Sequence, residues 1–268
     1  MQEINDTTSV TSVPVPESPT SDTRHLAPET TPTPDTRNLT PDTTETWQQT
    51  PEAQKLLRAL IAELLEANLE LNLTSIRDPE EAWIKHIGDS LKALQLGLFD
   101  APARLVDIGT GAGFPGFPLL IARPQLKMTL LESTGKKCSY MKNVAAKLGL
   151  KVSVLSDRAE RAGQSPVYRG RYHLATVRAV GKVSEVCELA LPLLVIGGHA
   201  ILWRGSTAEA DQKAAAKAVK MLGGEFVNRV KYRLPGHDMD YHLLVVRKTR
   251  PTPDMYPRRD GVPKSMPL

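Results

Sequence analysis

A glycine-rich turn follows an apolar segment near the middle of the chain. Residues 105–116 read LVDIGTGAGFPG, with glycines at positions 109, 111 and 113 directly after the apolar stretch. Glycine is needed where the backbone turns tightly and approaches a ligand closely, and ligands of open α/β sheets bind beyond the carboxyl ends of strands. Gly111, Gly113 and Gly116 also satisfy the G-x-G-x-x-G pattern of dinucleotide sites. The turn therefore predicts a ligand site, with a dinucleotide as one candidate.

Two acidic residues beside the turn bear on which ligand it binds. Asp107 lies in the strand just before the turn. A pyrophosphate gains nothing from a carboxylate there, whereas S-adenosylmethionine carries an ammonium and a sulfonium that a carboxylate attracts. Glu132 ends the next apolar segment, 19 residues after Gly113, where an acid can accept both ribose hydroxyls of either cofactor class. The residues favour S-adenosylmethionine and leave open a dinucleotide or a plain strand–turn–helix.

The surrounding pattern predicts a sheet that would position these residues. Seven apolar segments predict strands, at residues 104–108, 127–131, 152–155, 173–177, 199–203, 225–232 and 241–247. Helical patterns lie between them, at residues 116–122, 136–148, 183–191 and 208–222. Strands that alternate with helices indicate an α/β protein with a doubly wound, mostly parallel, Rossmann-like sheet of seven strands. We expect the last two strands to be antiparallel, because only a short segment separates them.

The chain before this sheet divides into two parts. Residues 1–50 contain 14 threonines and seven prolines and hardly a large apolar side chain, so we expect a disordered leader. Residues 51–101 predict an N-terminal helical cap. Its first helix has one apolar face, formed by Leu57, Leu60, Ile61, Leu64 and Leu65. Asp78-Pro79 begins a second helix that we expect to run to about Leu96. The sheet domain then covers residues 102–249, and residues 250–268 form a basic tail that we expect to be irregular.

Composition limits the class of protein. No apolar run approaches the roughly 18 residues of a membrane span, and the N-terminus lacks a signal-peptide pattern. Cys138 and Cys187 are too few for a disulfide framework or a cysteine-rich zinc site. We therefore expect a cytoplasmic protein without a bound metal.

The charge is unevenly distributed along the chain. Residues 1–50 carry a net charge of −6, which leaves +10 for residues 51–268. A basic protein of this kind favours a polyanionic partner such as nucleic acid. The candidates for contacts with a nucleic-acid backbone lie near the C-terminus: Arg247, Lys248, Arg250, Arg258, Arg259 and Lys264.

Several motifs taken together resemble one family. Residues 72–79 read NLTSIRDP, residues 86–91 read HIGDSL, and the glycine turn continues as PGFPL. Further matches are LES at 131–133, RAE at 158–160, VRA at 177–179 and YPRR at 256–259. Over about residues 52–268 the sequence resembles the glucose-inhibited division protein B family (RsmG), the bacterial guanine-N7 methyltransferases of small-subunit (16S) ribosomal RNA. The leader lies outside this resemblance.

The resemblance implies a class I S-adenosylmethionine-dependent methyltransferase with a defined set of site residues. The methionine part of the cofactor would lie against Gly109, Gly111, Gly113 and Phe114. The ribose would be held by Glu132, Ser133 and Thr134, and the adenine would be flanked by Ala159 and Glu160. Arg178 matches the family's arginine beside the reactive end of the cofactor. His86, which could orient the substrate or the cofactor loop, joins Arg178 as a candidate catalytic residue. The chain departs from the family pattern at Phe117, which is bulkier than expected, and at Arg204, where lysine is common.

The residues that are missing agree with the implied target. Methylation of cytosine C5 needs a cysteine nucleophile, usually after proline, but Cys138 follows Lys137 and Cys187 follows Val186. Methylation of an exocyclic amine commonly uses a loop with a Pro-Pro pair, which the sequence lacks. Guanine N7 has a free lone pair, so its attack on a sulfonium methyl needs positioning and desolvation more than a general base.

The sequence is therefore consistent with three functions. The resemblance favours methyl transfer to free ribosomal RNA or to the assembled small ribosomal subunit. A nicotinamide-dependent oxidoreductase is one alternative. The other is an RNA-binding ribosome assembly factor with the same fold and no turnover.

Overall fold

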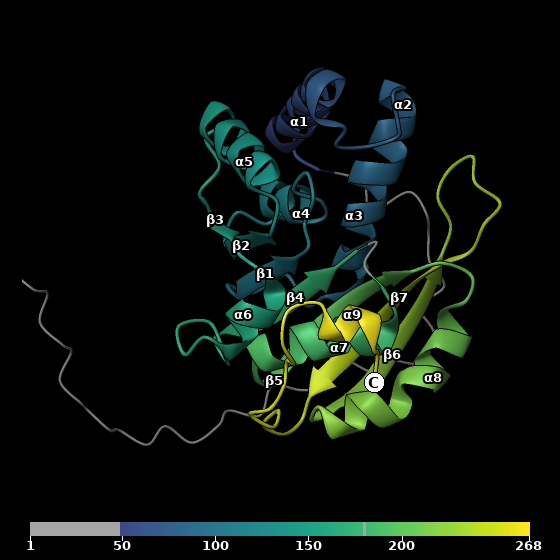
Figure 1. Ribbon diagram of the computed structural model, residues 1–268. Coiled ribbons are helices and arrows are strands. Elements are labelled where there is room, and N and C mark those ends of the chain that lie inside the picture. Colours follow the sequence, from purple (N-terminus) through teal and green to yellow (C-terminus); the bar gives the residue numbers. More distant parts are fainter. Residues whose placement is uncertain (1–48, 179–180) are drawn as a thin grey trace, which may run out of the picture. The chain divides into compact units, whose positions relative to one another are not determined.

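A seven-stranded sheet forms the centre of the computed structural model, which describes residues 49–178 and 181–268 (Figure 1). The strands are β1 (Arg104–Ile108), β2 (Lys127–Glu132), β3 (Val152–Ser156), β4 (Tyr172–Val177), β5 (Leu194–Arg204), β6 (Gly224–Tyr232) and β7 (Tyr241–Lys248). Their order is β3-β2-β1-β4-β5-β7-β6. Strands β1 to β5 are parallel, and β7 is antiparallel to both β5 and β6. The predicted α/β class, strand number and antiparallel closing pair are confirmed.

Helices cover both faces of the sheet, which explains why its central strands β1, β2 and β4 are mostly apolar and buried. The edge strand β6 instead alternates exposed and partly buried residues. On one side lie α4 (Gly116–Ala122), α5 (Gly135–Lys147) and the cap; on the other lie α6 (Ala159–Gln164), α7 (Val183–Ala190) and α8 (Ala208–Met221). Successive side chains of a strand point to opposite faces. Accordingly, Leu105 of β1 belongs to one buried apolar cluster, and Val106 and Ile108 belong to the other.

Strands β1 and β4 are neighbours in the middle of the sheet. From β1 the chain adds β2 and β3 toward one edge, and from β4 it continues toward the other edge. At such a switch point the loops after the two strands diverge and leave a crevice beyond their carboxyl ends. The glycine turn follows β1 and Arg178 follows β4. The topology therefore brings the two main parts of the predicted site to one edge of the sheet.

The cap begins with α1 (Pro51–Leu71) and shares the core of the sheet. Thr50 caps this helix, since its Oγ1 accepts a hydrogen bond from Ala53 N at 3.2 Å. The helix ends at Asn72, which adopts a left-handed conformation with φ 49°. Its buried apolar face packs in the same cluster as residues of β1, β2 and α4, so the expected cap has no core of its own.

The second part of the cap is helical over the expected length but is not one regular helix. It consists of α2 (Pro79–Ala82), a π-helical turn (Trp83–Gly88), α3 (Asp89–Leu91) and a 3-10 turn (Lys92–Leu96). In the π-helical turn the Asp89 N–H bonds to Ile84 O, five residues back, so it does not engage Lys85 O. The Lys85 carbonyl instead accepts a hydrogen bond from Arg178 Nη1 at 3.1 Å. The predicted extent of this helix, to Leu96, is therefore confirmed, but its centre is π-helical and its end is 3-10 helical.

The C-terminal tail is more ordered than expected. It contains α9 (Val262–Ser265), and Tyr256 is buried. Arg169 fixes its first part, donating hydrogen bonds to the carbonyls of Thr252 at 2.8 Å and Tyr256 at 2.6 Å. Outside the four residues of α9 the tail contains no helix or strand, as expected, but side chains of the sheet domain bind its backbone and hold it in place. No helix within the described residues has the length and hydrophobicity to cross a membrane. The expected disordered leader falls almost entirely outside those residues.

Candidate active site

The glycine turn after β1 has the conformation that its sequence predicts. Gly109, Gly111 and Gly113 have positive φ angles of 63°, 63° and 93°, where side chains are strained. At Gly113 there is also no room, because a Cβ would lie 2.2 Å from the Phe117 ring. The bulky Phe117 is therefore accommodated by the absence of a side chain at Gly113.

Asp107 is sealed beneath this turn and does not face a ligand. Its side chain is fully buried and accepts hydrogen bonds from Gly116 N at 2.9 Å, Thr176 Oγ1 at 2.8 Å and Thr110 Oγ1. Burial raises the pKa of Asp107 to about 6, although these hydrogen bonds and the charge of Arg178 oppose the shift. Asp107 is therefore not available for direct contact with a ligand, because internal donors occupy its buried carboxylate; its attraction for the charges of the cofactor stays a prediction.

A pocket of about 290 Å³ opens at the carboxyl ends of β1, β2 and β3. Its lining includes five of the predicted cofactor residues: Gly109, Glu132, Ser133, Ala159 and Glu160. We call it the nucleoside pocket, after the part of the ligand that the sequence analysis predicts to bind these residues. Glu132 is 7% exposed; its Oε1 accepts from Thr134 N at 2.8 Å and its Oε2 from Gly111 N at 3.1 Å. Gly111 and Thr134 thus support the pocket through Glu132.

The nucleoside pocket is rich in carboxylates. Its charged lining residues are Glu132, Asp157, Glu160 and Glu185, opposed by Arg158 and Lys264. Glu160 is already committed, since it pairs with Arg158 Nη2 at 2.6 Å and accepts from Gly261 N at 2.8 Å. Burial acts against ionisation, but these two partners lower the pKa of Glu160. The surroundings therefore present a set of mainly negative side chains to a ligand.

Three other predicted residues, His86, Phe114 and Arg178, form a second cluster at the junction of the cap and the sheet. Arg178 Nη1 pairs with Asp89 Oδ2 at 3.0 Å, and Arg178 Nη2 lies 3.5 Å from His86 Nδ1. Phe114 joins both residues: its ring centroid is 5.8 Å from Arg178 Cζ and 4.9 Å from the His86 ring centroid. The structure thus brings together His86, Phe114 and Arg178, which come from three separate motifs.

The surroundings of His86 determine what it can do. Burial, with the charges of Arg178 and Lys85, lowers the pKa of His86 to about 4, so the imidazole is neutral near pH 7. A guanidinium can only donate, so Nδ1 acts as the acceptor that faces Arg178. The proton then resides on Nε2, which lies 3.0 Å from Thr74 Oγ1. Both ring nitrogens have partners, which suits a residue that orients Arg178.

Two further residues of this cluster were not recognised in the sequence. Tyr232 Oη donates to Asp89 Oδ1, and Trp203 Nε1 donates to Asp89 O at 2.9 Å. They come from β6 and β5, more than 100 positions after Asp89. No local spacing links residues so far apart, so only the folded sheet reveals that they hold the partner of Arg178.

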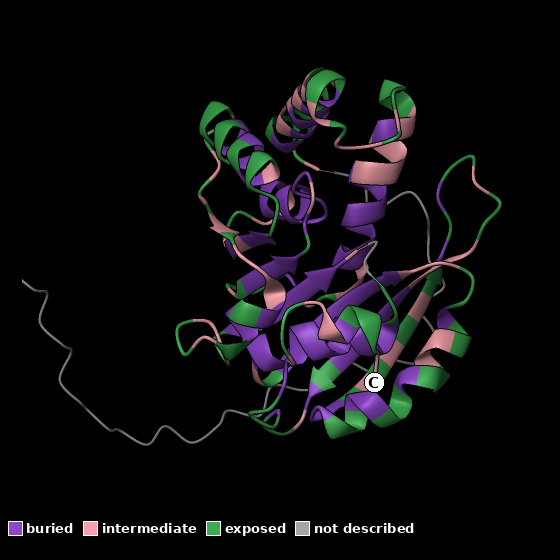
Figure 2. Ribbon diagram, in the orientation of Figure 1, coloured by how far each residue is buried: buried purple, intermediate pink, exposed green. Residues whose placement is uncertain are grey.

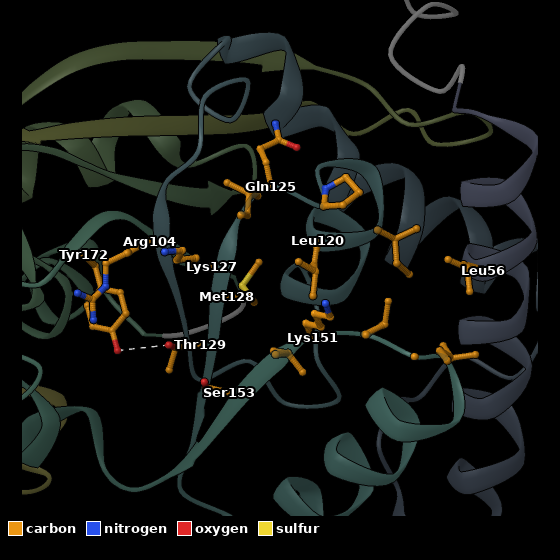
Figure 3. A pocket seen from close by; sticks show the side chains of 17 residues that line it. Leu56, Arg104, Leu120, Gln125, Lys127, Met128, Thr129, Lys151, Ser153 and Tyr172 are labelled. Carbon is orange, nitrogen blue, oxygen red and sulfur yellow. Dashed lines mark hydrogen bonds between the residues drawn. The ribbon is translucent and has the colours of Figure 1, made fainter. Parts of the chain in front are cut away.

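A larger hollow, of about 1140 Å³, lies at the opposite edge of the sheet (Figure 3). Its lining includes the first residues of four strands, Arg104, Lys127, Val152 and Tyr172. None of the predicted site residues is among its lining residues. Ligands of doubly wound sheets bind at the carboxyl ends of strands, so its size does not make it the site. Within residues 49–178 and 181–268 no cluster of histidine, cysteine and acidic side chains is arranged to hold a metal ion.

Two of the basic residues assigned to a nucleic-acid backbone have other roles. Lys248 is 5% exposed, and its Nζ donates to Leu191 O at 2.8 Å and Leu194 O at 2.7 Å. Arg258 Nη2 pairs with the buried Glu188 at 2.7 Å. The expectation of RNA contact is wrong for Lys248, which solvent does not reach, and Arg258 is engaged inside the protein. Arg247, Arg250, Arg259 and Lys264 are exposed, and their contact with RNA stays a prediction.

Comparison with known proteins agrees with this architecture. The family model GidB, described as rRNA small subunit methyltransferase G, matches residues 53–237. A protein of Synechococcus sp. (strain JA-2-3B'a(2-13)) named ribosomal RNA small subunit methyltransferase G is 40% identical over 228 residues, which cover 83% of this chain and 88% of that protein. The protein of the same name from Synechococcus elongatus is 42% identical over 224 residues, which cover 83% of this chain and 93% of the relative.

A solved structure supports the fold alone. The [4+2]-cyclase SpnF has a TM-score of 0.52 and 16% sequence identity, over 74% of this chain and 96% of SpnF. Because the cyclase is named for a different reaction, the shared sheet does not by itself fix the chemistry. The sequence matches do identify the family: the chain belongs to the GidB family of small-subunit ribosomal RNA methyltransferases.

Proposed function

We propose that this protein transfers a methyl group from S-adenosylmethionine to N7 of a guanine in small-subunit ribosomal RNA. Membership of the GidB family supports ribosomal RNA methylation. The choice of guanine N7 rests on the resemblance of the motifs and on the chemistry of the second cluster. The observation that carries the cofactor assignment is the hydrogen bond from Gly116 N to Asp107.

The hydrogen bond from Gly116 N to Asp107 argues against binding of a dinucleotide at this turn. A dinucleotide fold binds pyrophosphate with the free N–H groups of the glycine turn and the following helix. Here the N–H of Gly116, the first residue of α4, is taken by the Asp107 carboxylate, and the N–H of Gly111 is taken by Glu132. A pyrophosphate at this place would lack these two donors and would lie next to the carboxylate of Glu132. The nicotinamide-dependent alternative is therefore not supported.

The nucleoside pocket fits a ligand without phosphates. Four carboxylates and two cations line it, which favours a ligand of positive or neutral charge. S-adenosylmethionine supplies an electrophilic methyl group on a positively charged sulfonium. We assign Glu132 to the ribose, with Ser133 and Thr134 beside it, and Ala159 and Glu160 to the adenine. The glycine turn and Phe114 remain our assignment for the methionine part.

The second cluster suits an acceptor that has no proton to lose. Arg178 is held by Asp89 and the Lys85 carbonyl, and His86 has a partner on each ring nitrogen. A base for proton abstraction must reach the reacting proton, whereas here both nitrogens of His86 have partners and both oxygens of Asp89 accept hydrogen bonds from Arg178 or Tyr232. Attack by guanine N7 needs only that the acceptor is placed and water is excluded. We therefore assign orientation of the acceptor to Arg178 and support of Arg178 to His86.

A ribosomal RNA substrate fits the charge of the protein and implies a cytoplasmic location. The net charge of +10 over residues 51–268 favours a polyanion. Lys136 is exposed and Lys137 is partly exposed in the first turn of α5, directly after the residues assigned to the ribose. We propose that they face phosphates of the RNA. Their loss would then reduce the salt dependence of RNA binding.

Calorimetric titration of the protein with S-adenosylmethionine, NAD and NADP tests the cofactor. We expect binding of S-adenosylmethionine alone, and its loss in Glu132→Ala. A matched control is Glu225→Ala, because Glu225 is exposed on β6. Binding of a nicotinamide nucleotide would overturn the assignment.

Methyl transfer tests the reaction. Small ribosomal subunits and free 16S RNA are incubated with protein and methyl-labelled cofactor, and the RNA is cleaved chemically at 7-methylguanosine. We expect one cleavage site that Arg178→Ala removes. RNA binding without methyl incorporation would instead favour the assembly factor, and label at another atom would refute guanine N7.

A further inference from the structure

The C-terminal tail is fastened to the helix that borders the nucleoside pocket. Arg258 donates to Glu188 of α7 from its backbone N at 2.8 Å, Nε at 2.9 Å and Nη2 at 2.7 Å. Glu188 is completely buried. All eight residues of α7 are buried, and Figure 2 shows this helix in the colour of buried residues with α9 in front of it. Because every residue of α7 is buried, other segments must pack against all of its faces, and the C-terminal tail is one of these segments.

A second attachment lies at the pocket itself. Gly261 N donates to Glu160 Oε1 at 2.8 Å, and Asp260 Oδ2 pairs with Arg161 Nη2 at 2.6 Å. Glu160 and Arg161 belong to α6, whose first residues we assign to the adenine. The turn that begins α9 is thus held by contacts within the protein against the end of the pocket that we assign to the adenine.

This attachment places Lys264 in the lining of the nucleoside pocket. Lys264 lies on α9 and is exposed. The other cation of the lining, Arg158, is paired with Glu160, whereas Lys264 has no hydrogen bond or ion pair with any residue in the described part of the chain. Within the described residues, Lys264 is therefore the cation of this lining whose charge no carboxylate neutralises.

We propose that the tail is a wall of the cofactor site and that Lys264 donates a hydrogen bond to the adenine ring. The proposal rests on the proposed function, which supplies an adenosine-containing cofactor. Adenine offers ring nitrogens as acceptors, whereas ionised carboxylates can only accept. The four acidic side chains of the lining cannot serve these nitrogens, and Lys264 can. This assigns to the cofactor a basic residue that the sequence pattern assigned to RNA.

The test compares two basic residues of the tail: Lys264, which lines the nucleoside pocket, and Arg259, which does not. Lys264→Met removes the donor, and Arg259→Met removes one exposed positive charge from the same tail outside the lining of the nucleoside pocket. We measure the affinity of the full-length protein for S-adenosylmethionine and for S-adenosylhomocysteine by calorimetry. Lys264→Met should weaken both about tenfold, which corresponds to about 1.4 kcal/mol. Arg259→Met should leave both affinities unchanged, and Lys264→Arg should restore most of the loss.

The two ligands separate a hydrogen bond from a general effect of charge. Both contain adenosine, but only S-adenosylmethionine carries the sulfonium. Loss of a hydrogen bond to adenine weakens them equally, whereas loss of a repelling charge would strengthen binding of S-adenosylmethionine alone. Equal affinities in the wild type and Lys264→Met, or stronger binding of S-adenosylmethionine, would overturn the proposal and leave the proposed function intact. Failure of the wild-type protein to bind either ligand would refute the proposed function, and this inference with it.

Discussion

Replacement of Asp107 by asparagine should stabilise the protein above about pH 6. The carboxylate is fully buried beneath the glycine turn, and asparagine has nearly the same shape. Its amide oxygen can accept from Gly116 N and Thr110 Oγ1, as the carboxylate does now. Its amide nitrogen can donate to Thr176 Oγ1, because a threonine hydroxyl also accepts. Asp107→Asn therefore removes a buried charge and keeps the hydrogen bonds.

The pKa of Asp107 gives the size of the effect. Its folded-state value of about 6 lies above the ordinary value of 3.8. A carboxyl whose pKa rises on folding holds its proton more tightly in the folded state, so stability is highest below about pH 4. It falls as the pH rises through 6. The difference between the two pKa values corresponds to about 3 kcal/mol. The variant has no proton to lose and should escape this loss.

Urea unfolding of both proteins between about pH 4 and pH 8 measures the difference. The free energy of unfolding should be similar for the two proteins at the acidic end, and the variant should be more stable by about 3 kcal/mol at the alkaline end. Glu225→Gln is the control, because Glu225 is exposed on β6 and its replacement should not reproduce the pH-dependent gain in stability. If the variant were less stable than the wild type at pH 8, the three hydrogen bonds to the Asp107 carboxylate would stabilise the folded protein by more than burial of its charge destabilises it.

Three more substitutions test other parts of the site. Tyr232→Phe removes a donor to Asp89 and should lower the free energy of unfolding by about 1.5–3 kcal/mol, with cofactor affinity unchanged; urea unfolding and calorimetry check this. Gly113→Ala places a Cβ 2.2 Å from the Phe117 ring at φ 93°, so we expect a loss of about 1–3 kcal/mol and weaker cofactor binding; a stable variant with normal affinity would contradict this. Arg258→Met leaves its buried carboxylate partner uncompensated, which should cost about 3–5 kcal/mol in thermal unfolding, and an unchanged midpoint would show that the ion pair contributes nothing.

The sequence was sufficient where one local pattern determines one structural role. The glycine turn needs positive φ angles that only glycine adopts freely, so Gly109, Gly111 and Gly113 could be placed by type and spacing. The strands could be found because a parallel sheet buried on both faces requires continuous apolar segments. Glu132 followed from its place at the end of the second strand, and it does line the nucleoside pocket.

The sequence was insufficient where a side chain's role depends on contacts between distant segments. Asp107 was expected to face the ligand, but a strand pattern does not show which carboxylate will find donors inside the protein. The sequence pattern placed Lys248 and Arg258 on the surface. In the structure Lys248 donates to two backbone carbonyls and Arg258 pairs with a buried carboxylate. Lys264 belongs to the nucleoside pocket because Gly261 bonds to Glu160, which lies 101 positions earlier.

The cap is connected to the reactive end of the site through one residue. Asp89 lies in α3, and its carboxylate binds Arg178 after β4 and Tyr232 at the end of β6, while its carbonyl accepts from Trp203 of β5. Three strand ends are thereby tied to the segment in which the π-helical turn presents His86 and Lys85 O to Arg178. Since the sheet is shared with a protein named as a cyclase, the fold does not determine the reaction. The cap contributes the residues that orient Arg178, so we expect the chemistry to depend on the cap as much as on the cofactor pocket.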